Sequence, residues 1–530
     1  MLRRAMTTFD TPHWLLSPPH DSYSDYLLRK GGSAVEKARS TYPEEIVAEL
    51  ERSGLRGRGG AGFPTGTKWR TTMAHPCPTR FVVCNAAEGE PGTFKDRYLL
   101  RRDPYSMLEG VLIAAHVVGA SAAYVAMKAS FTKELSRVRS ALVEMKDAGA
   151  LGDVQVHVVE GSEEYLFGEE RALLEVIEGN DPLPREPHYP PYEKGLFATA
   201  VSANPAVVNN VETFARVPDI VRHGAASFRK LGTENTPGPL LFTLSGAVAR
   251  PGVYEREAGI SLRSLVFDVA GGLAEGRSVK AILSGVSVAP LGPEKLDTPA
   301  DHAHLVLAGG GLGSAGFIVL DDKADMVRVT QAVARFLYVE SCNQCPACKH
   351  GLRTASNAID ELFSAELATP DDAERALYGA RHAPQGNRCY LPVQGSILLP
   401  ALLRRFSRDF DAQLAAPSGG GAPFLVPKII DFDEATRTFV YDESQARKRP
   451  NWTYEDPPAV APREQGPVSV ATPRPIKPAS PAAVSHGLRT ATARLAPDVR
   501  EGLSRVVRDE SEVDAVVNAA LRDWLSERGA

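Results

Sequence analysis

The chain has 530 residues and a formal net charge of -5, with 43% hydrophobic and 24% charged residues. This length predicts three or more domains, and the mild charge argues against a protein that coats nucleic acid. Six cysteines do not make a disulfide framework and suit a reducing compartment. The first ten residues lack the apolar core of a signal peptide, and the most apolar run, 111–120, is too short for a bilayer. We therefore expect a cytoplasmic protein that can still be peripheral to a membrane complex.

A glycine-rich loop fills residues 54–69, with the sequence Gly-Leu-Arg-Gly-Arg-Gly-Gly-Ala-Gly-Phe-Pro-Thr-Gly-Thr-Lys-Trp. Glycines let the backbone approach a ligand and present N–H groups to phosphate, and Arg58 and Lys68 add positive charge. The loop is neither a Walker A loop nor a G-x-G-x-x-G fingerprint. A flexible loop without a ligand therefore stays an alternative.

Three polar segments follow this loop. The apolar strand predicted at 81–84 ends in Asn-Ala-Ala-Glu-Gly-Glu-Pro-Gly, residues 85–92, and ligands of α/β proteins usually sit at the carboxyl ends of strands. Glu88 and Glu90 either form a solvated turn or bind ribose or flavin polar groups. Residues 164–171 precede a helical pattern, and residues 207–213 carry adjacent amides suited to the edge of a heteroaromatic ring.

The most informative segment is Cys342-Asn-Gln-Cys-Pro-Ala-Cys348, which follows a helical pattern that starts at Met326. Three thiols at C-x2-C-x2-C, closed by the distant Cys389, are typical of a [4Fe–4S] cluster. There are two alternatives: a mixed zinc site that includes His350 or His382, or four buried cysteines without a metal. We expect Cys389 in a loop before a helix at 397–410.

The C-terminal part has three predicted segments. Residues 416–445 are expected to form a hairpin extension, and the proline- and alanine-rich residues 446–486 a disordered linker. Residues 487–530 have a strand–helix–helix pattern, with an apolar stripe on the last helix. This tail resembles a ribbon-helix-helix module, which dimerises and contacts DNA, but packing against a partner subunit explains the pattern equally well.

Five motifs in one order, from the glycine loop to the cysteine run, resemble the flavin-carrying, NADH-oxidising subunit of respiratory complex I. The same family includes the diaphorase subunits of NAD-dependent formate dehydrogenases and NAD-reducing hydrogenases. The resemblance implies an α/β flavin domain at 1–235, a ubiquitin-like β-grasp module at 236–324 and a helical bundle with an iron–sulfur cluster at 325–415. It also implies an iron–sulfur partner subunit and a further catalytic dehydrogenase, hydrogenase or respiratory subunit.

The resemblance also assigns site residues. The residues that it implies for FMN are Gly57, Arg58, Gly59, Gly60, Ala61, Lys68, Asn85, Glu88, Tyr165, Gly168, Glu169, Asn209, Asn210 and Thr213. Those that it implies for NAD(H) are Phe63, Glu90, Glu170 and Phe197, with Phe63 on the adenine. The cluster ligands are Cys342, Cys345, Cys348 and Cys389.

The chain departs from the family pattern near the expected nucleotide. Ala87 stands where a carboxylate is usual, and the family's Lys-Pro-Pro-Phe-Pro segment reads Pro-His-Tyr-Pro-Pro at 187–191. The leading hypothesis is a flavin and iron–sulfur oxidoreductase subunit that passes electrons between NAD(H) and a partner redox protein. There are two alternatives. In the first the chain binds the same cofactors but exchanges electrons with a partner other than a pyridine nucleotide, such as ferredoxin. In the second it is a non-catalytic redox-sensing or assembly module.

Overall fold

The computed structural model describes residues 14–29, 31–186, 188–364, 366–417 and 424–455. These described residues belong to one compact unit. The expected tail at 487–530 and most of the expected linker lie outside the described residues. In the part of the chain that is described, no helix is long and apolar enough to cross a membrane.

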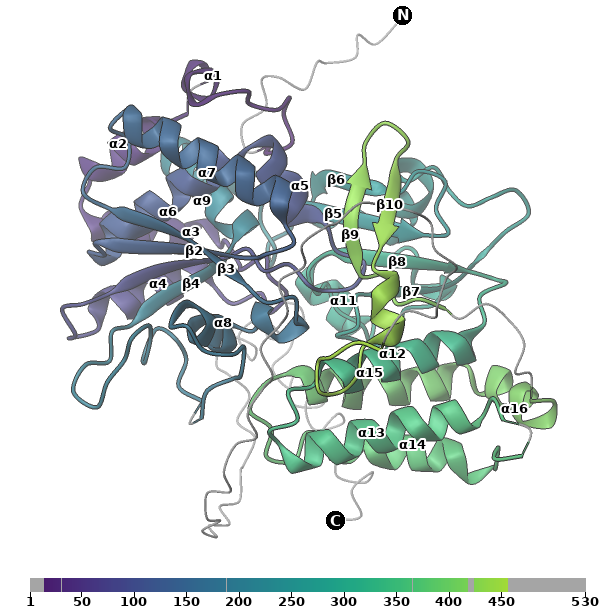
Figure 1. Cartoon of the computed structure of the whole chain (residues 1–530). Coiled ribbons are helices and arrows are strands. Elements are labelled where there is room, and N and C mark those ends of the chain that lie inside the picture. The colour runs from purple at the N-terminus through teal and green to yellow at the C-terminus, as the bar shows by residue number, and fades with distance from the viewer. Residues whose placement is uncertain (1–13, 30, 187, 365, 418–423, 456–530) are drawn as a thin grey trace, which may run out of the picture. The chain divides into compact units, whose positions relative to one another are not determined.

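The first half of the unit is an α/β domain around a parallel sheet in the order β3-β2-β1-β4, which confirms the α/β part of the expected fold class (Figure 1). Alternate residues of the inner strand β1 point to opposite faces of the sheet. Val82 therefore packs into the core under α6 and α9, while Val83 packs under α8. The strands are β1 (Phe81–Asn85), β2 (Ala122–Lys128), β3 (Gln155–Gly161) and β4 (Ala206–Asn210).

The helices of this domain begin and end at recognisable signals. The long helix α6 starts with Pro104 after Asp103, whose side chain accepts from the Ser106 N–H, and ends at Gly119 with φ +68°. The helices are α1 (Tyr23–Leu28), α2 (Ser33–Arg39), α3 (Pro43–Ser53), α4 (Thr65–Ala74), α5 (Lys95–Arg102), α6 (Pro104–Val118), α7 (Thr132–Asp147), the 3-10 helix η1 (Tyr165–Gly168), α8 (Glu170–Ile177), α9 (Val211–His223) and α10 (Ala225–Phe228).

A second, mixed sheet follows in the order β6-β5-β8-β7. Strands β5 and β6 form an antiparallel hairpin, β8 pairs with β5 in parallel, and β7 pairs with β8 antiparallel. Its elements are β5 (Pro239–Gly246), β6 (Gly252–Glu257), the π-helix η2 (Ser264–Val269), β7 (Val279–Ser284), η3 (Pro293–Lys295), α11 (His302–Leu307) and β8 (Gly316–Asp321).

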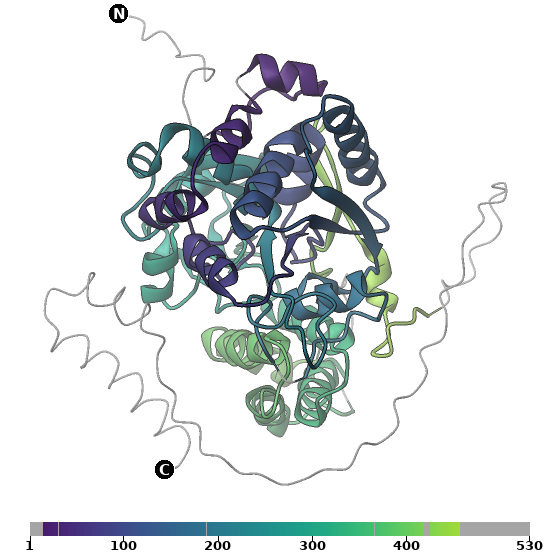
Figure 2. The same ribbon diagram turned by 90° about the vertical axis from the view of Figure 1, so that its left-hand side faces the viewer.

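The third part is a helical bundle, seen from a second side in Figure 2. Helices α13 and α14 pack closely because both have glycine at the crossing: a Cβ on Gly351 would lie 2.5 Å from the Gly379 carbonyl oxygen. The helices are α12 (Met326–Glu340), α13 (Pro346–Glu361), α14 (Asp371–His382), α15 (Leu391–Arg405) and α16 (Ser407–Ala415). The helix expected at 397–410 is therefore wrong: Pro392 in the first turn favours an earlier start, and Phe406 interrupts the helix.

After the bundle, β9 (Ile429–Asp433) and β10 (Thr438–Tyr441) pair antiparallel, and η4 (Glu443–Arg447) follows. The expected start of a disordered linker at 446 is wrong, because residues up to 455 pack in the unit. Lys448 is fully buried and its Nζ lies 2.7 Å from Glu340 Oε2. The composition of this stretch is polar, but a buried ion pair holds it against α12.

Candidate functional site

A cavity lies where all three parts of the unit meet, at the carboxyl ends of β1 and β4. We call it the seam cavity. The α/β domain supplies the glycine loop, the loop after β1 and the start of α8, the second sheet supplies the loop before β8, and the bundle supplies the start of α15. The lining residues are Gly59, Asn85, Ala87, Glu88, Gly89, Glu90, Thr93, Asp96, Tyr165, Leu166, Gly168, Glu169, Asn210, Ser314, Cys389, Tyr390, Leu391 and Gln394.

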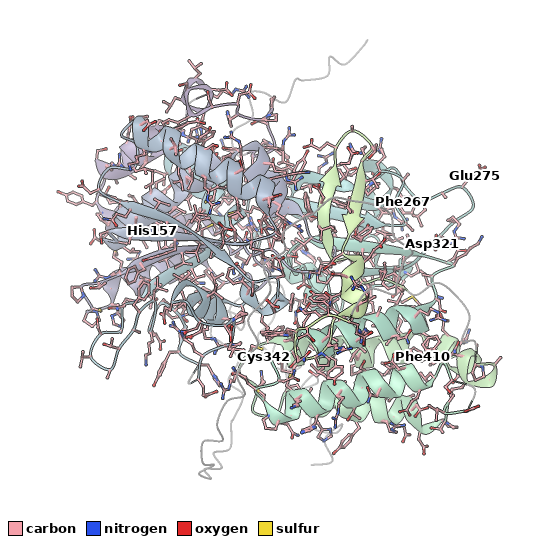
Figure 3. The ribbon with its side chains drawn as sticks, viewed as in Figure 1. His157, Phe267, Glu275, Asp321, Cys342 and Phe410 are labelled. Atoms are coloured by element: carbon pink, nitrogen blue, oxygen red, sulfur yellow. The ribbon has the colours of Figure 1, made fainter. Side chains whose placement is uncertain are left out.

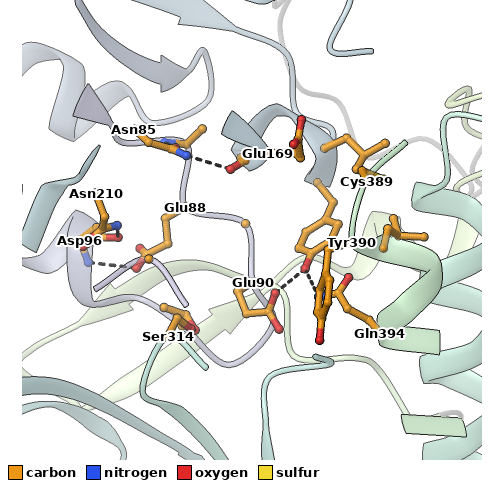
Figure 4. A pocket seen from close by; sticks show the side chains of 18 residues that line it. Asn85, Glu88, Glu90, Asp96, Glu169, Asn210, Ser314, Cys389, Tyr390 and Gln394 are labelled. Atoms are coloured by element: carbon orange, nitrogen blue, oxygen red, sulfur yellow. Dashed lines mark hydrogen bonds between the residues drawn. The ribbon is translucent and has the colours of Figure 1, made fainter. Parts of the chain in front are cut away.

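Hydrogen bonds between distant segments hold the walls of the seam cavity together (Figure 4). The Asn85 amide donates to the Gly168 carbonyl at 2.8 Å. The Tyr165 hydroxyl donates to Glu90 at 2.5 Å and accepts from the Gln394 amide at 2.8 Å. Tyr165 therefore links the α/β domain to the bundle across the cavity.

Three carboxyl groups that line the seam cavity, those of Glu90, Asp96 and Glu169, have a raised pKa. Burial raises the pKa of Glu90 and of Glu169 despite the hydrogen bonds that both accept. Burial also raises the pKa of Asp96 to about 6, although Lys95 lies 2.8 Å away and counteracts the shift. Carboxyls, amides and hydroxyls beside the apolar Leu166 and Leu391 suit a flat ligand that is apolar on its faces and polar at its edges.

The seam cavity brings together a part of the residues expected for the cofactors. Those that line it are Gly59, Asn85, Glu88, Glu90, Tyr165, Gly168, Glu169 and Asn210. Those that do not line it are Gly57, Arg58, Gly60, Ala61, Phe63, Lys68, Glu170, Phe197, Asn209 and Thr213.

Several of the second group bind one another or nearby protein groups. Lys68 Nζ lies 3.2 Å from Glu170 Oε2 and 3.0 Å from the Val208 carbonyl oxygen. The Arg58 N–H donates to the Thr213 hydroxyl at 2.8 Å. The Arg58 guanidinium is buried, and its Nε and Nη1 have no hydrogen-bond partner among the described residues. Two such orphaned donors behind the glycine loop suit an anionic group such as the phosphate of a cofactor.

The aromatic residues expected for the nucleotide lie at the surface of the α/β domain. Phe63 is 38% exposed and stacks on Tyr192, with 6.0 Å between the ring centroids. Phe197 packs edge-on against Phe81 and Tyr124 and has a positive φ of 54°, which is unusual for a bulky residue. Tyr192 was not expected in the site, because nothing in its local sequence marks it.

All four candidate cluster cysteines line a second, smaller cavity between α12, α13 and α15, which we call the cysteine cavity. Its other lining residues are Leu166, Ser341, Leu391 and Pro392. Cys342 follows α12, Cys345 caps α13, and Cys348 lies in the first turn of that helix. Cys342 is only partly buried and lies where the bundle meets the α/β domain (Figure 3). The cysteines thus surround one space, as ligands of a cluster must.

Burial raises the pKa of the Cys342, Cys348 and Cys389 thiols, that of Cys348 to about 12. The hydroxyl of Ser341 lies 3.3 Å from Cys348 Sγ and is the one polar side chain beside the thiols in the lining. His350 and His382 do not line the cavity, and His382 Nδ1 lies 2.7 Å from the Tyr378 carbonyl oxygen. Among the described residues, no three His, Cys, Asp or Glu side chains form a group that could hold one metal ion.

The two cavities share a wall. Leu166, Cys389 and Leu391 line both. Sequence patterns did not indicate Ser314, Leu391 or Gln394, because these residues reach the seam cavity only through contacts between distant segments. Asp96 carried a weak signal, since it follows Glu90 after a Pro-Gly turn.

Comparisons with known proteins agree with this geometry. Residues 50–219 match the family described as Nuo51 FMN-binding domain, and residues 328–413 match the NADH-ubiquinone oxidoreductase-F iron-sulfur binding region. The first range includes all residues expected for FMN and NAD(H), and the second includes all four cysteines.

Similar proteins cover most of the described unit. The second F-type subunit of the NADH-quinone oxidoreductase of Rhizobium meliloti is 40% identical over 402 residues, which are 74% of this chain and 94% of that protein. The corresponding protein of Aquifex aeolicus is 38% identical over 403 residues, 74% of this chain and 92% of that protein. An NAD+-reducing [NiFe]-hydrogenase in the H2-reduced state superposes with a TM-score of 0.66 at 34% identity, over 72% of this chain and 64% of that one. The chain therefore belongs to the family of F-type subunits of NADH-quinone oxidoreductase.

Proposed function

We propose that the chain is the NADH-oxidising subunit of a multi-subunit complex and passes electrons between NAD(H) and a partner redox protein through FMN and one [4Fe–4S] cluster. A bound flavin accepts a hydride as an electron pair and releases the electrons singly, which is what a cluster accepts. The observation that supports this function best is the shared wall: Cys389 lines both the seam cavity and the cysteine cavity.

In this proposal the residues of the seam cavity hold the flavin. Asn85 fixes the loop after β1 to Gly168, so both walls keep their spacing. Gly59 leaves room for close approach, because a Cβ there would lie only 3.3 Å from the Asn210 Cβ. Arg58 supplies orphaned donors for the phosphate. The other residues that the family resemblance assigns to FMN complete the site.

Phe63, Glu90, Glu170 and Phe197 are proposed to contact NAD(H). Glu90 holds the Tyr165 hydroxyl and accepts from the Val286 N–H at 2.7 Å, so it orients a wall on which the nicotinamide can be placed. Lys68 is paired with Glu170, so the proposed flavin and nucleotide residues are already in contact. This arrangement keeps NAD(H) beside the flavin as hydride transfer requires.

The four cysteines are proposed as the cluster ligands. Leu166 and Leu391 separate the two cavities with apolar side chains, which excludes water from the path between the cofactors. Because the chain carries four cysteines in this cavity and no second cysteine cluster among the described residues, the electrons need a partner subunit with its own cofactor.

Three finer assignments belong to the same proposal. Residues 236–324 form a β-grasp module, supported by the mixed sheet in which β8 lies parallel to β5 and between β5 and β7. The boundaries at 235, 324 and 415 divide the unit into flavin, β-grasp and cluster domains. A reducing compartment is supported by six cysteines that are all free.

Anaerobic titration of the full-length protein with NADH tests the function. We expect the flavin absorbance to bleach and the electron paramagnetic resonance signal of a reduced [4Fe–4S] cluster to rise with it. Protein that contains both cofactors but shows neither change with NADH would contradict the proposal.

A further inference from the structure

Lys128 is a buried lysine at the end of β2, directly behind the wall of the seam cavity. Its side chain is 2% exposed. A Cβ on Gly89, which lines the cavity, would lie 3.0 Å from Lys128 Nζ and 3.6 Å from the ring of Tyr165. Only the backbone of Gly89 therefore separates the amine from the cavity.

Lys128 has no counterion among the described residues. Its Nζ donates to the backbone carbonyl of Glu163 at 3.0 Å, a neutral acceptor. The Glu163 carboxylate itself is turned to Ser130, where it accepts from the N–H at 2.9 Å and from the hydroxyl at 2.5 Å. Burying a lysine without a paired charge is costly, so the uncharged amine is favoured.

Two carboxylates in this region are paired with Lys448 and Lys428, the lysines whose charges act on Lys128. Glu340, at the end of α12, pairs with the fully buried Lys448 at 2.7 Å. Asp442 pairs with Lys428 at 3.1 Å. Neither carboxylate forms an ion pair with Lys128.

Within the α/β domain, the charge of the Glu163 carboxylate opposes the effect of burial on the pKa of Lys128 but does not outweigh it. From the loop after β1, Glu90 accepts from the Tyr165 hydroxyl, and the Tyr165 ring of η1 lies beside Gly89 on the same side as the amine. Burial, and secondarily the charge of Lys428, lowers the pKa of Lys128 to about 7.

We propose that Lys128 takes up one proton from solvent whenever the flavin in the seam cavity is reduced, and releases it when the flavin is reoxidised. The inference rests on the proposed function. NADH gives up a hydride and leaves as NAD+, so the cavity gains two electrons and one proton, a net charge of one minus. A proton bound by the Lys128 amine cancels this charge, because a nearby negative charge favours the ammonium form.

When the flavin is reoxidised, the electrons and protons leave the cavity again. Two electrons leave singly for the iron–sulfur cluster, the proton that arrived with the hydride is released, and Lys128 returns its own proton to solvent. Lys128 is a charge-compensating residue and does not donate to the substrate. Arginine cannot take this role, since its guanidinium stays protonated at all relevant pH values.

The test is the midpoint potential of the flavin in the full-length, FMN-loaded protein, measured by spectroelectrochemistry between about pH 5 and 9 in roughly half-unit steps. Wild type and Lys128→Arg are compared. Above about pH 7 we expect the wild-type potential to fall with pH twice as steeply as that of Lys128→Arg, because two protons instead of one accompany two electrons. Below about pH 6 both slopes should be equal.

Two further variants separate charge from structure. Lys128→Met should have the shallow slope of Lys128→Arg at a lower potential, since it lacks the positive charge. Lys428→Met should move the onset of the steep slope to higher pH, because it removes a cation that disfavours protonation of Lys128, whereas the exposed Lys323→Met should leave the wild-type profile unchanged.

Equal slopes in wild type and Lys128→Arg above pH 7 would overturn the inference, even if the Met variant fails to fold. Protein that binds no FMN at all would instead contradict the proposed function, so the two failures are distinguishable.

Discussion

The seam cavity and the cysteine cavity share a wall, yet their linings differ in kind. Carboxyls, amides and hydroxyls from three parts of the unit line the seam cavity, whereas leucines, a proline and one serine hydroxyl surround the four thiols. Burial raises the pKa of Glu90 in the first and of Cys348 in the second. The Glu90 carboxylate accepts two hydrogen bonds from the protein, whereas the thiols have almost no polar partner.

This difference matches the chemistry proposed for each cavity. Hydride transfer changes the proton count, so its cavity needs hydrogen-bonding groups and a titratable neighbour such as Lys128. Electron transfer through a cluster moves no heavy atom, so its cavity needs only ligands and an apolar shell that lowers the dielectric constant. A substitution in the cysteine cavity should therefore affect the cluster and spare FMN, and a substitution in the seam cavity should affect FMN and spare the cluster.

The largest effect is expected for Cys389→Ala, which removes a proposed cluster ligand from the shared wall. The iron content should fall to background, while FMN stays bound and NADH still reduces an artificial acceptor of flavin electrons. Iron analysis and flavin absorbance of the same anaerobic preparation measure both. Cys77→Ala is the control, since Cys77 lies outside both cavities. Full iron occupancy in Cys389→Ala would mean that another residue is the fourth ligand.

The next effect concerns the ion pair between Lys448 and Glu340, which holds residues 446–455 against α12. Lys448→Met leaves Glu340 buried without its charged partner, and breaking a buried pair costs about 3–5 kcal/mol of unfolding free energy. Urea denaturation followed by circular dichroism measures this loss. The matched control is Lys323→Met at an exposed position, where we expect a change within about 0.5 kcal/mol. Equal stability of both variants would show that the segment does not hold the unit together.

Local sequence patterns predicted much of the fold and part of the site. The strand at 81–84, the helix before Cys342 and the placement of four cysteines around one space followed from periodicity and spacing. The seam cavity residues Ser314 and Gln394 could not be predicted, because their neighbours are distant in sequence: Gln394 contacts Tyr165 across 229 positions. Composition also misjudged residues 446–455, since it does not reveal that Lys448 meets Glu340, 108 positions away.

A smaller effect is expected for Asn85→Ala in the seam cavity. The Asn85 side chain donates to the Gly168 carbonyl at 2.8 Å and accepts from the Ala87 N–H at 3.2 Å, so its loss releases two cavity walls. We expect FMN to bind about tenfold more weakly, roughly 1.4 kcal/mol, with the cluster content unchanged. Titration of FMN fluorescence measures the affinity. Asn180→Ala, which removes an exposed hydrogen bond to Glu175, should bind FMN like the wild type.

The smallest effect is expected at the surface of the α/β domain, where Tyr192 stacks on Phe63. If Phe63 contacts the adenine of NADH as proposed, Tyr192 fixes the ring from its other side, and an aromatic pair contributes about 0.5–1.5 kcal/mol. Tyr192→Ala should therefore raise KM for NADH about threefold and leave kcat unchanged, because the hydride is transferred at the seam cavity. Steady-state kinetics of Tyr192→Ala beside Tyr189→Ala, an exposed tyrosine of the same loop, test this. A fall in kcat with constant KM would place Tyr192 in the support of the flavin rather than of the nucleotide.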